Sequence, residues 1–243
     1  KMKYKIIFAY DGSKFFGYSV QKNEEHTIQA VIEKTLSTIL NKATKIYASG
    51  RTDKGVHALN QVATFETKEE INTTKVLHSL NKMISNDIYF KSLKLANDNF
   101  DARFSAKSKT YEYVINTKEY NPFLRKYEVY IKDIDTKKMK ECAKVFVGKH
   151  CFKNFTSKPT DTNDFVRNIF SIKFLNKKDH LIIEFTGDGF MTYMVRKLMG
   201  AMIEVSKGTM SVQEVKDLLD AKERTIITYT SVPQALFLKK VSY

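Results

Sequence analysis

Residues 49–57, with the sequence SGRTDKGVH, bring together side chains that could do chemistry. Asp53 lies between the cations of Arg51 and Lys54, in a segment flanked by two stretches typical of strands. A carboxylate beside a glycine, here Gly55, more commonly caps a turn than catalyses a reaction. The alternative is a nucleophile that a nearby cation keeps anionic and correctly directed. The spacing alone leaves both interpretations open.

Arg196 is the candidate for that cation. Residues 190–206 are apolar on nearly every side, which predicts a buried helix with Arg196 in its middle. A buried guanidinium must find a carboxylate or several other acceptors. An arginine that reaches the surface, or pairs with any nearby acid, is the commoner arrangement. Pairing with Asp53 is the more specific hypothesis.

Aromatic side chains on one predicted strand suggest a second role. Tyr111, Tyr113 and Ile115 share a face under the period of two that strands follow. Aromatic residues on the sheet of a basic protein can stack on unpaired bases. An ordinary half-buried strand with cross-strand tyrosine pairs explains the same pattern.

The charge of the chain indicates a polyanionic partner. Lys and Arg total 41 against 27 Asp and Glu in 243 residues, which gives a formal net charge of +14. Such an excess favours nucleic acid. A solvated basic surface and a membrane surface are the alternatives.

Several classes of site are disfavoured. The two cysteines, Cys142 and Cys151, form neither a CxxC nor a metal-ligand spacing, and Cys142 falls on the apolar face of a predicted helix. No phosphate-binding loop or zinc-protease motif occurs, and 187–189 lacks the third glycine of a dinucleotide fingerprint. No apolar run approaches the ~20 residues of a membrane helix. We therefore expect a cytoplasmic protein with no metal, no small-molecule cofactor and no membrane partner.

Hydrophobic periodicity and turn signals define the elements of each half. The first half predicts strands at 4–10, 45–48, 61–66 and 87–95, a helix with Thr27 as its N-cap, and a helix over 74–81. The second half predicts strands at 109–116, 127–131, 168–175, 181–187 and 235–241, and helices over 135–147, which Gly148 could end, over 190–206, and after the capping box Ser211–Glu214.

This order indicates an α+β fold in which helices cover one face of a largely antiparallel sheet. The boundary is expected between 103 and 108. It separates an N-terminal half, 1–105, with the Asp53 segment from a C-terminal half, 106–243, with the tyrosine strand and the arginine helix.

Taken together, the motifs resemble the TruA family of tRNA pseudouridine synthases. The family loop GRTDAGVHA is matched at eight of nine positions by residues 50–58. Further resemblances lie in order along the chain: YDGSKFFGY with Gln21 (10–21), FDARFSAKSKTYEY (100–113), NPFLRKY (121–127), GFMTYMVRKLMG (189–200) and the C-terminal ALFLKKVSY.

The resemblance implies a cofactor-free isomerase that converts uridine to pseudouridine at positions 38, 39 and 40 of the tRNA anticodon stem-loop. It also implies the pseudouridine synthase fold, in which two similar α+β halves share a mixed, mainly antiparallel sheet with flanking helices and a central basic cleft. Members of the family are homodimers. The target base must leave its stack before a carboxylate can reach it.

Roles follow by matching positions. Asp53 resembles the catalytic aspartate and Arg196 the arginine that pairs with it. Arg51 resembles the loop arginine that flips or holds the nucleotide. Tyr111 matches the tyrosine against the target base, where it could also act as a base, and Leu236 matches the apolar residue on the base's other side.

The chain departs from the family pattern at three places. Tyr18-Ser19 replaces a Trp-Gln pair, Lys54 replaces an alanine, and residues 235–238 read ALFL in place of GLYL. Lys54 adds a cation beside the predicted nucleophile, where it could contact a phosphate. A non-catalytic tRNA-binding protein or chaperone, and a pseudouridine synthase with other RNA sites, are the alternative functions.

Overall fold

The computed structural model describes residues 1–157, 164–225 and 227–243. These residues form two compact units, 1–107 with 237–243, and 108–236. The division differs from the expected 1–105 and 106–243 in its treatment of the last strand. β10 (Leu236–Ser242) pairs in parallel with β3 (His57–Thr67) through Phe237 and Leu238, so its residues from 237 onward belong to the first unit.

The first unit is built on a mixed sheet. Its strands follow the order β4 (Ile88–Ala96), β1 (Met2–Tyr10), β3, β10, and β2 (Tyr47–Ala48) pairs with β3. β1 is antiparallel to both neighbours. β3 begins at His57 and not at 61, because His57 and Ala58 already pair with β10. The loop before β3 is therefore shorter than the sequence suggested.

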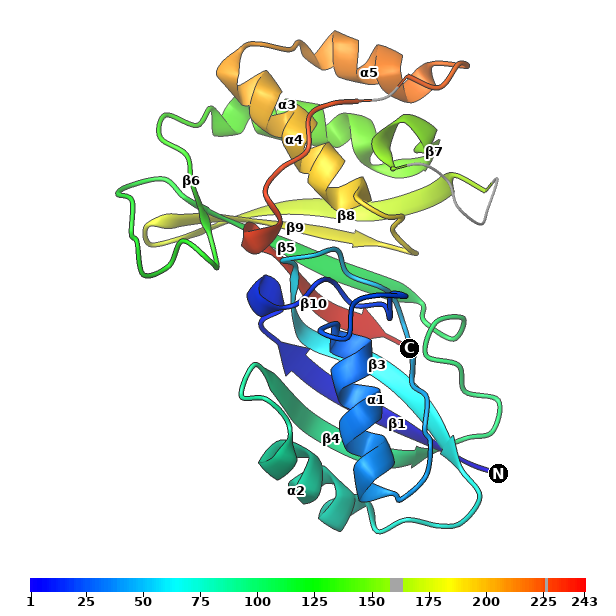
Figure 1. Cartoon of the computed structure of the whole chain (residues 1–243). Coiled ribbons are helices and arrows are strands. Elements are labelled where there is room, and N and C mark those ends of the chain that lie inside the picture. Colours follow the sequence, from blue (N-terminus) through cyan, green and yellow to red (C-terminus); the bar gives the residue numbers. More distant parts are fainter. Residues whose placement is uncertain (158–163, 226) are drawn as a thin grey trace. The chain divides into compact units, whose positions relative to one another are not determined.

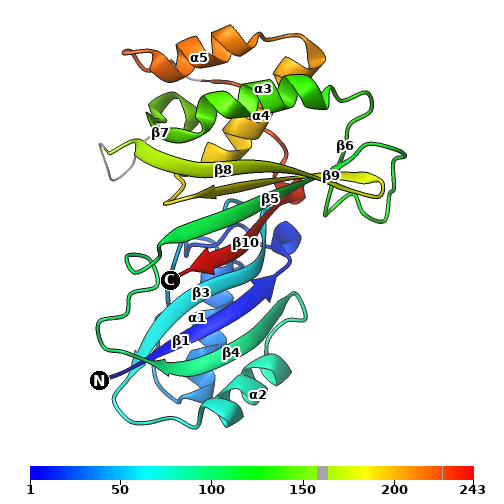
Figure 2. The ribbon, with the colours of Figure 1, turned by 180° about the vertical axis from the view of Figure 1, so that it is seen from behind.

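Two helices cover one face of this sheet, α1 (Ile28–Ile39) and α2 (Thr73–Met83) (Figures 1 and 2). The N-cap predicted for α1 is confirmed, since Thr27 accepts a hydrogen bond from the Ala30 amide at 3.3 Å. α1 buries Ile28, Ile32 and Leu36, the apolar face that its sequence predicts.

The second unit has strands in the order β5 (Ser108–Asn116), β9 (His180–Gly187), β8 (Val166–Lys177), β7 (Gly148–Cys151). These neighbours are antiparallel. The strand predicted at 127–131 is reduced to β6 (Val129–Tyr130), which runs parallel to β5. β7 has no counterpart among the sequence predictions.

Three helices lie over one face of the second sheet, α3 (Thr136–Phe146), α4 (Met194–Lys207) and α5 (Val212–Asp220) (Figure 2). The capping box at Ser211 and Glu214 is confirmed. So is the core position of Cys142, which is 0% exposed; burial raises the pKa of its thiol to about 12.

The start of α4 corrects the sequence interpretation. Tyr193 precedes the helix with a left-handed φ of 61°, so the helix begins at Met194 and not at 190. Arg196 therefore lies in the first turn and is half-buried, rather than occupying the middle of the helix. The apolar residues that follow it are buried, as predicted.

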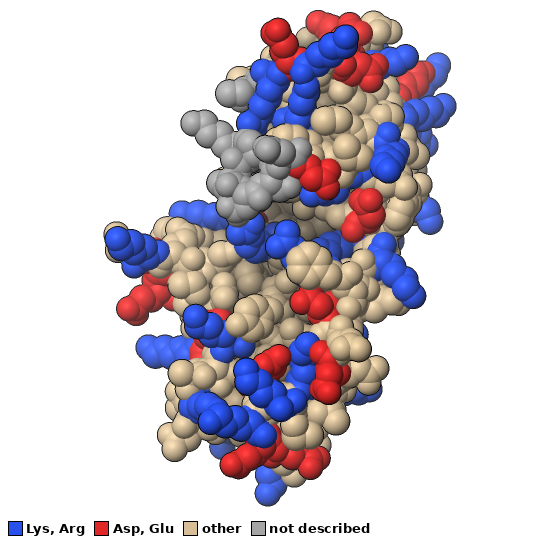
Figure 3. All heavy atoms as spheres, turned by 90° about the vertical axis from the view of Figure 1, so that its right-hand side faces the viewer, with Lys and Arg blue, Asp and Glu red and all other residues tan. Residues whose placement is uncertain are grey.

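The α+β class with a mixed, mainly antiparallel sheet is confirmed. Figure 3 shows Lys and Arg side chains spread over one face of the molecule and interleaved with Asp and Glu. The central basic cleft stays a prediction. Within the described residues, no helix has the length and apolar character needed to cross a bilayer.

Candidate active site

The Asp53 segment is a tight turn between β2 and β3. The Val56 amide donates to the Asp53 carbonyl at 3.1 Å, and Gly55 adopts a φ of +83°. A left-handed third residue is the mark of a type II turn, which favours glycine there. Asp53 is the first residue of this turn and is partly exposed. The backbone of Asp53 therefore takes part in a turn, while a capping role for its carboxylate stays a prediction.

Buried polar side chains support the loop from beneath. Thr52 Oγ1 and the Tyr10 hydroxyl lie 2.7 Å apart, and Gln61 donates to the Gly50 carbonyl at 2.9 Å. The Tyr18 amide donates to the Thr52 carbonyl at 3.1 Å. Burial raises the pKa of Tyr10 to about 12, so its hydroxyl stays neutral and able to hydrogen-bond.

Tyr18 stands where the family pattern has a tryptophan. Its ring is 3% exposed, and its hydroxyl is buried with no hydrogen-bond partner among the described residues. Burial is the largest cause that raises the pKa of Tyr18 well above its usual value, and the nearby Tyr10 and Glu33 raise it further. The tyrosine that differs from the family pattern is therefore part of the buried packing next to the loop.

Gly12 allows another segment to approach the loop, and Gly17 gives that segment its left-handed backbone. A Cβ on Gly12 would lie 1.9 Å from the Val56 carbonyl oxygen. Gly17 has a φ of +88°, and a Cβ there would lie 3.4 Å from the Lys54 amide. The Gly12 amide also donates to His57 Nδ1 at 3.0 Å. Residues 11–18 therefore fix the position of the loop backbone.

The two cations of the loop are both exposed. The Lys54 Nζ lies 4.1 Å from the centroid of the Phe16 ring. A cation over an aromatic face is stabilised by about 0.5–1 kcal/mol at an exposed site. This contact positions Lys54 without removing its charge from solvent.

In the second unit, Tyr111 and Tyr113 lie on one face of β5, as predicted, and both are buried. The Tyr111 ring meets Phe190 edge to face, with centroids 5.3 Å apart. The Tyr113 hydroxyl donates to the Val232 carbonyl at 3.1 Å. Burial raises the pKa of Tyr113 to about 12, against the lowering effects of hydrogen bonds and of Arg196.

The Arg196 side chain is held by the segment that precedes β10. Its Nε donates to the Ser231 carbonyl at 2.9 Å, while the Ser231 amide donates to the Arg196 carbonyl at 2.9 Å. The guanidinium carbon lies 4.7 Å from the centroid of the Tyr193 ring. Reciprocal bonds and a ring contact give this arginine a defined direction.

Lys197 and Gly200 support that segment, and the sequence did not single them out. Lys197 is 8% exposed, and its Nζ donates to the Ile227 carbonyl at 2.6 Å. Burial is the largest cause that lowers the pKa of Lys197, and the positive charges of Arg196 and Arg224 lower it further. A Cβ on Gly200 would meet the Tyr229 backbone at 2.8 Å, so glycine is what lets residues 229–230 lie against α4.

The predicted site residues fall into two groups. Asp53, Arg51 and Lys54 share one loop of the first unit. Tyr111, Arg196 and Leu236 belong to the second unit, where Leu236 is 4% exposed and its amide donates to the Pro233 carbonyl. The pairing of Asp53 with Arg196 stays a prediction.

The chemistry available is that of a carboxylate, cations and aromatic rings. No group of three or more His, Cys, Asp or Glu side chains that could hold a metal ion occurs within the described part of the chain. A partly exposed aspartate on a turn can act as a nucleophile toward an electrophilic carbon.

A family model described as tRNA pseudouridine synthase matches residues 6–105 and 142–243. This chain belongs to that family. tRNA pseudouridine synthases are isomerases that convert uridine to pseudouridine, and the resemblance found in the sequence is confirmed at the level of the family. The chain is 38% identical over 242 residues to tRNA pseudouridine synthase A 2 of Bacillus anthracis, with 99% of each chain covered. It is 40% identical over 246 residues to tRNA pseudouridine synthase A of Listeria monocytogenes serotype 4b, again with 99% of each covered.

Among solved structures, a chain of a Cbf5-Nop10-Gar1 complex aligns with a TM-score of 0.39 at 14% identity. The alignment covers 83% of this pseudouridine synthase chain and 44% of that chain, so this chain spans less than half of its length. A chain of an H/ACA RNP bound to a substrate RNA containing 2'-deoxyuridine aligns with a TM-score of 0.38 at 13% identity, covering 83% and 43% of the two chains.

Proposed function

We propose that this tRNA pseudouridine synthase acts in the cytoplasm as a homodimer on uridines 38, 39 and 40 of the tRNA anticodon stem-loop. The observation that carries the proposal is the Asp53 turn within a chain that aligns end to end with named tRNA pseudouridine synthases A. The net charge of +14 supports a polyanionic substrate.

Asp53 is the proposed nucleophile. Its carboxylate adds either to C6 of the flipped uracil or to C1′ of its ribose, and the bond between N1 and C1′ breaks. The ring then turns so that C5 bonds to C1′, C5 loses its proton to solvent, and the carboxylate is released. Flipping the base costs a few kcal/mol, which contacts with phosphates can offset.

The other predicted residues bind and orient. Arg196, fixed by Ser231 and Tyr193, is proposed to pair with Asp53 and keep it anionic. Tyr111 and Leu236 are proposed to hold the two sides of the extruded base, and Tyr111 could also accept a proton. Arg51 and Lys54 are exposed, as groups that handle the nucleotide and its phosphates must be.

Mapping of pseudouridine tests the substrate assignment. Unmodified tRNA incubated with the enzyme, and tRNA from a deletion strain, are probed chemically at each uridine. We expect pseudouridine at 38, 39 and 40 with the enzyme and its loss in the deletion strain. Modification elsewhere would point to a synthase with other RNA sites, and tRNA binding without modification would point to a chaperone.

A further inference from the structure

The loop that joins β5 to β6, residues 117–128, combines exposed aromatic and basic side chains. Tyr120 is 54% exposed and Phe123 is 86% exposed. Lys118, Arg125 and Lys126 are exposed on the same loop. Two exposed rings on one loop offer apolar surface whose burial on binding is favourable.

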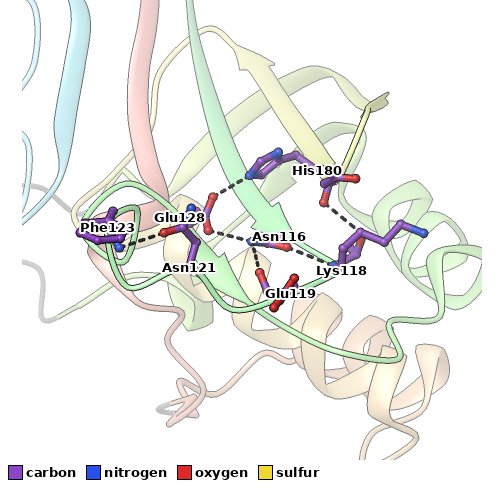
Figure 4. A network of polar contacts seen from close by, with 9 residues as sticks. Asn116, Lys118, Glu119, Asn121, Phe123, Glu128 and His180 are labelled. Carbon is purple, nitrogen blue, oxygen red and sulfur yellow. Dashed lines mark hydrogen bonds and ion pairs between the residues drawn. The ribbon is translucent and has the colours of Figure 1, made fainter.

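A buried polar network holds the base of this loop (Figure 4). The side-chain nitrogen Nδ2 of Asn116 donates to the Glu119 carbonyl at 2.7 Å and to Glu128 Oε1 at 2.8 Å. The other oxygen of Glu128 lies 2.6 Å from His180 Nε2, and Glu128 is 5% exposed. The two ends of the loop are thus fastened to each other and to β9.

The tip of the loop is ordered by its own hydrogen bonds. Asn121 Oδ1 accepts from the Phe123 amide at 2.9 Å, which is the local turn that Asn favours. The Asn121 carbonyl accepts from the Leu124 amide at 3.1 Å. Arg125 donates from Nη1 to the Pro122 carbonyl, which directs its guanidinium. A loop ordered in advance loses less entropy when it binds.

A surface cavity of about 610 Å³ lies beside this loop. Its lining includes Tyr120, Arg125, Lys126, Tyr130 and Gln234. The rings of Tyr120 and Tyr130 meet edge to face with centroids 6.2 Å apart. Aromatic faces next to cations are the combination that binds single-stranded nucleic acid, by stacking on bases and by contact with phosphates. The cavity volume is within the range of small-ligand sites.

We propose that this cavity binds an unpaired nucleotide of the tRNA substrate other than the target uridine. The base stacks on Tyr120, and the adjoining phosphate meets Arg125 and Lys126. The proposal rests on the function proposed above and extends it to a second contact. Asn116, at the base of the loop, is five strand positions beyond Tyr111, about 17 Å along β5. Gln234 of the lining is two residues before Leu236, and the lining includes neither Leu236 nor Tyr111. We therefore assign the cavity to affinity and not to the chemical step.

Affinity for an unmodified full-length tRNA transcript tests the proposal. We expect Tyr120→Ala to weaken binding about tenfold, since stacking on an aromatic ring is worth ~1–3 kcal/mol per base. Tyr120→Phe keeps the ring and should bind like wild type. Arg125→Ala should weaken binding and reduce the salt slope by about one. Matched controls outside the cavity are the exposed Phe170→Ala on β8 and Lys137→Ala on α3, for which binding stays at the wild-type level.

Turnover separates this contact from the active site. Tyr120→Ala and Arg125→Ala should raise KM for tRNA and leave kcat at the wild-type value. Wild-type affinity in both variants, each with a wild-type melting temperature, would overturn the proposal. A second result would also overturn the proposal. If Phe123→Ser changed the oligomeric state measured by light scattering but left tRNA affinity unchanged, the loop would be an interface between copies of the chain. Affinity for tRNA does not require turnover, so absence of wild-type turnover would count against the proposed function and not against this cavity.

Discussion

Lys54 lies over the ring of Phe16, with its Nζ 4.1 Å from the ring centroid. The contact joins the turn of Asp53 to the segment that packs behind it, so the cation that distinguishes this loop from the family pattern has a fixed place. Lys54 remains exposed there, which is compatible with contact to a phosphate.

Lys54→Ala should therefore weaken tRNA binding and flatten the dependence of log affinity on log salt by about one. Phe16→Leu removes the ring but keeps the charge, so the slope should stay at the wild-type value. The measurement is filter binding over a series of salt concentrations. Lys34→Ala, an exposed lysine on α1, is the control. An unchanged salt slope in Lys54→Ala would show that Lys54 is a solvated surface residue that does not contact tRNA.

Substitution of Arg196 tests its proposed pairing with Asp53. Arg196→Met should abolish turnover, because the nucleophile would lose the cation that keeps it anionic. Arg196→Lys keeps the charge but loses the directed Nε bond to Ser231, so it should retain partial activity, with the acidic limb of its pH–rate profile moved to higher pH. Near-normal turnover of Arg196→Met would rule out the pair.

Gly12→Ala should disturb the Asp53 turn from a distance. The new Cβ would overlap the Val56 carbonyl, so the backbone on one side must move. We expect a loss of stability of about 1–3 kcal/mol together with a large fall in kcat.

Gly208→Ala is the matched control for this change. Gly208 has a φ of +78° with open space around its Cβ position, so alanine there costs about 1–2 kcal/mol of backbone strain. Thermal melting and turnover of the two variants should then separate: both lose stability, but only Gly12→Ala loses kcat. Equal kcat values would show that the turn does not depend on Gly12.

Buried tyrosines should make the protein sensitive to alkali. Burial raises the pKa values of Tyr10 and Tyr113 from 10.0 to about 12. A rise of this size corresponds to about 3 kcal/mol per group. Because the folded pKa lies above the unfolded one, this stabilisation is complete below pH 10 and is lost as the pH rises toward 12.

The free energy of unfolding should accordingly fall between pH 10 and pH 12, and tyrosinate absorbance should rise cooperatively with unfolding. Denaturant titrations at several pH values measure the first quantity. Tyr113→Phe removes one of the groups and should reduce the slope. A free energy of unfolding that is flat over this range would contradict the assignment.

Local signals in the sequence predicted most of the elements, because those signals are themselves local. The N-cap of Thr27, the capping box of Ser211 and the burial of alternate residues in β5 need only neighbouring residues to be recognised. The start of α4 was misplaced because the apolar pattern includes 190–193, while the left-handed backbone of Tyr193 sets the start of the helix at Met194.

Contacts between distant segments could not be predicted in the same way. The parallel pairing of β10 with β3 depends on the topology of the whole unit. A lysine in a predicted helix is usually assigned to the surface. The sequence therefore did not predict the buried hydrogen bond from Lys197 to the Ile227 carbonyl. Asp53 and Arg196 were proposed as partners from the arginine in an apolar helix and then from the family resemblance, and their pairing remains a prediction.

Release of tritium from tRNA labelled at uridine C5 tests the central claim most directly. Isomerisation replaces the bond between C5 and its hydrogen with the new bond between C5 and C1′, so the label is lost to solvent. We expect the wild-type enzyme to release tritium in proportion to its target uridines. Asp53→Asn keeps the size of the side chain and its place in the turn but lacks the nucleophilic carboxylate, so it should bind tRNA and release none. Release by Asp53→Asn at the wild-type rate would contradict the account.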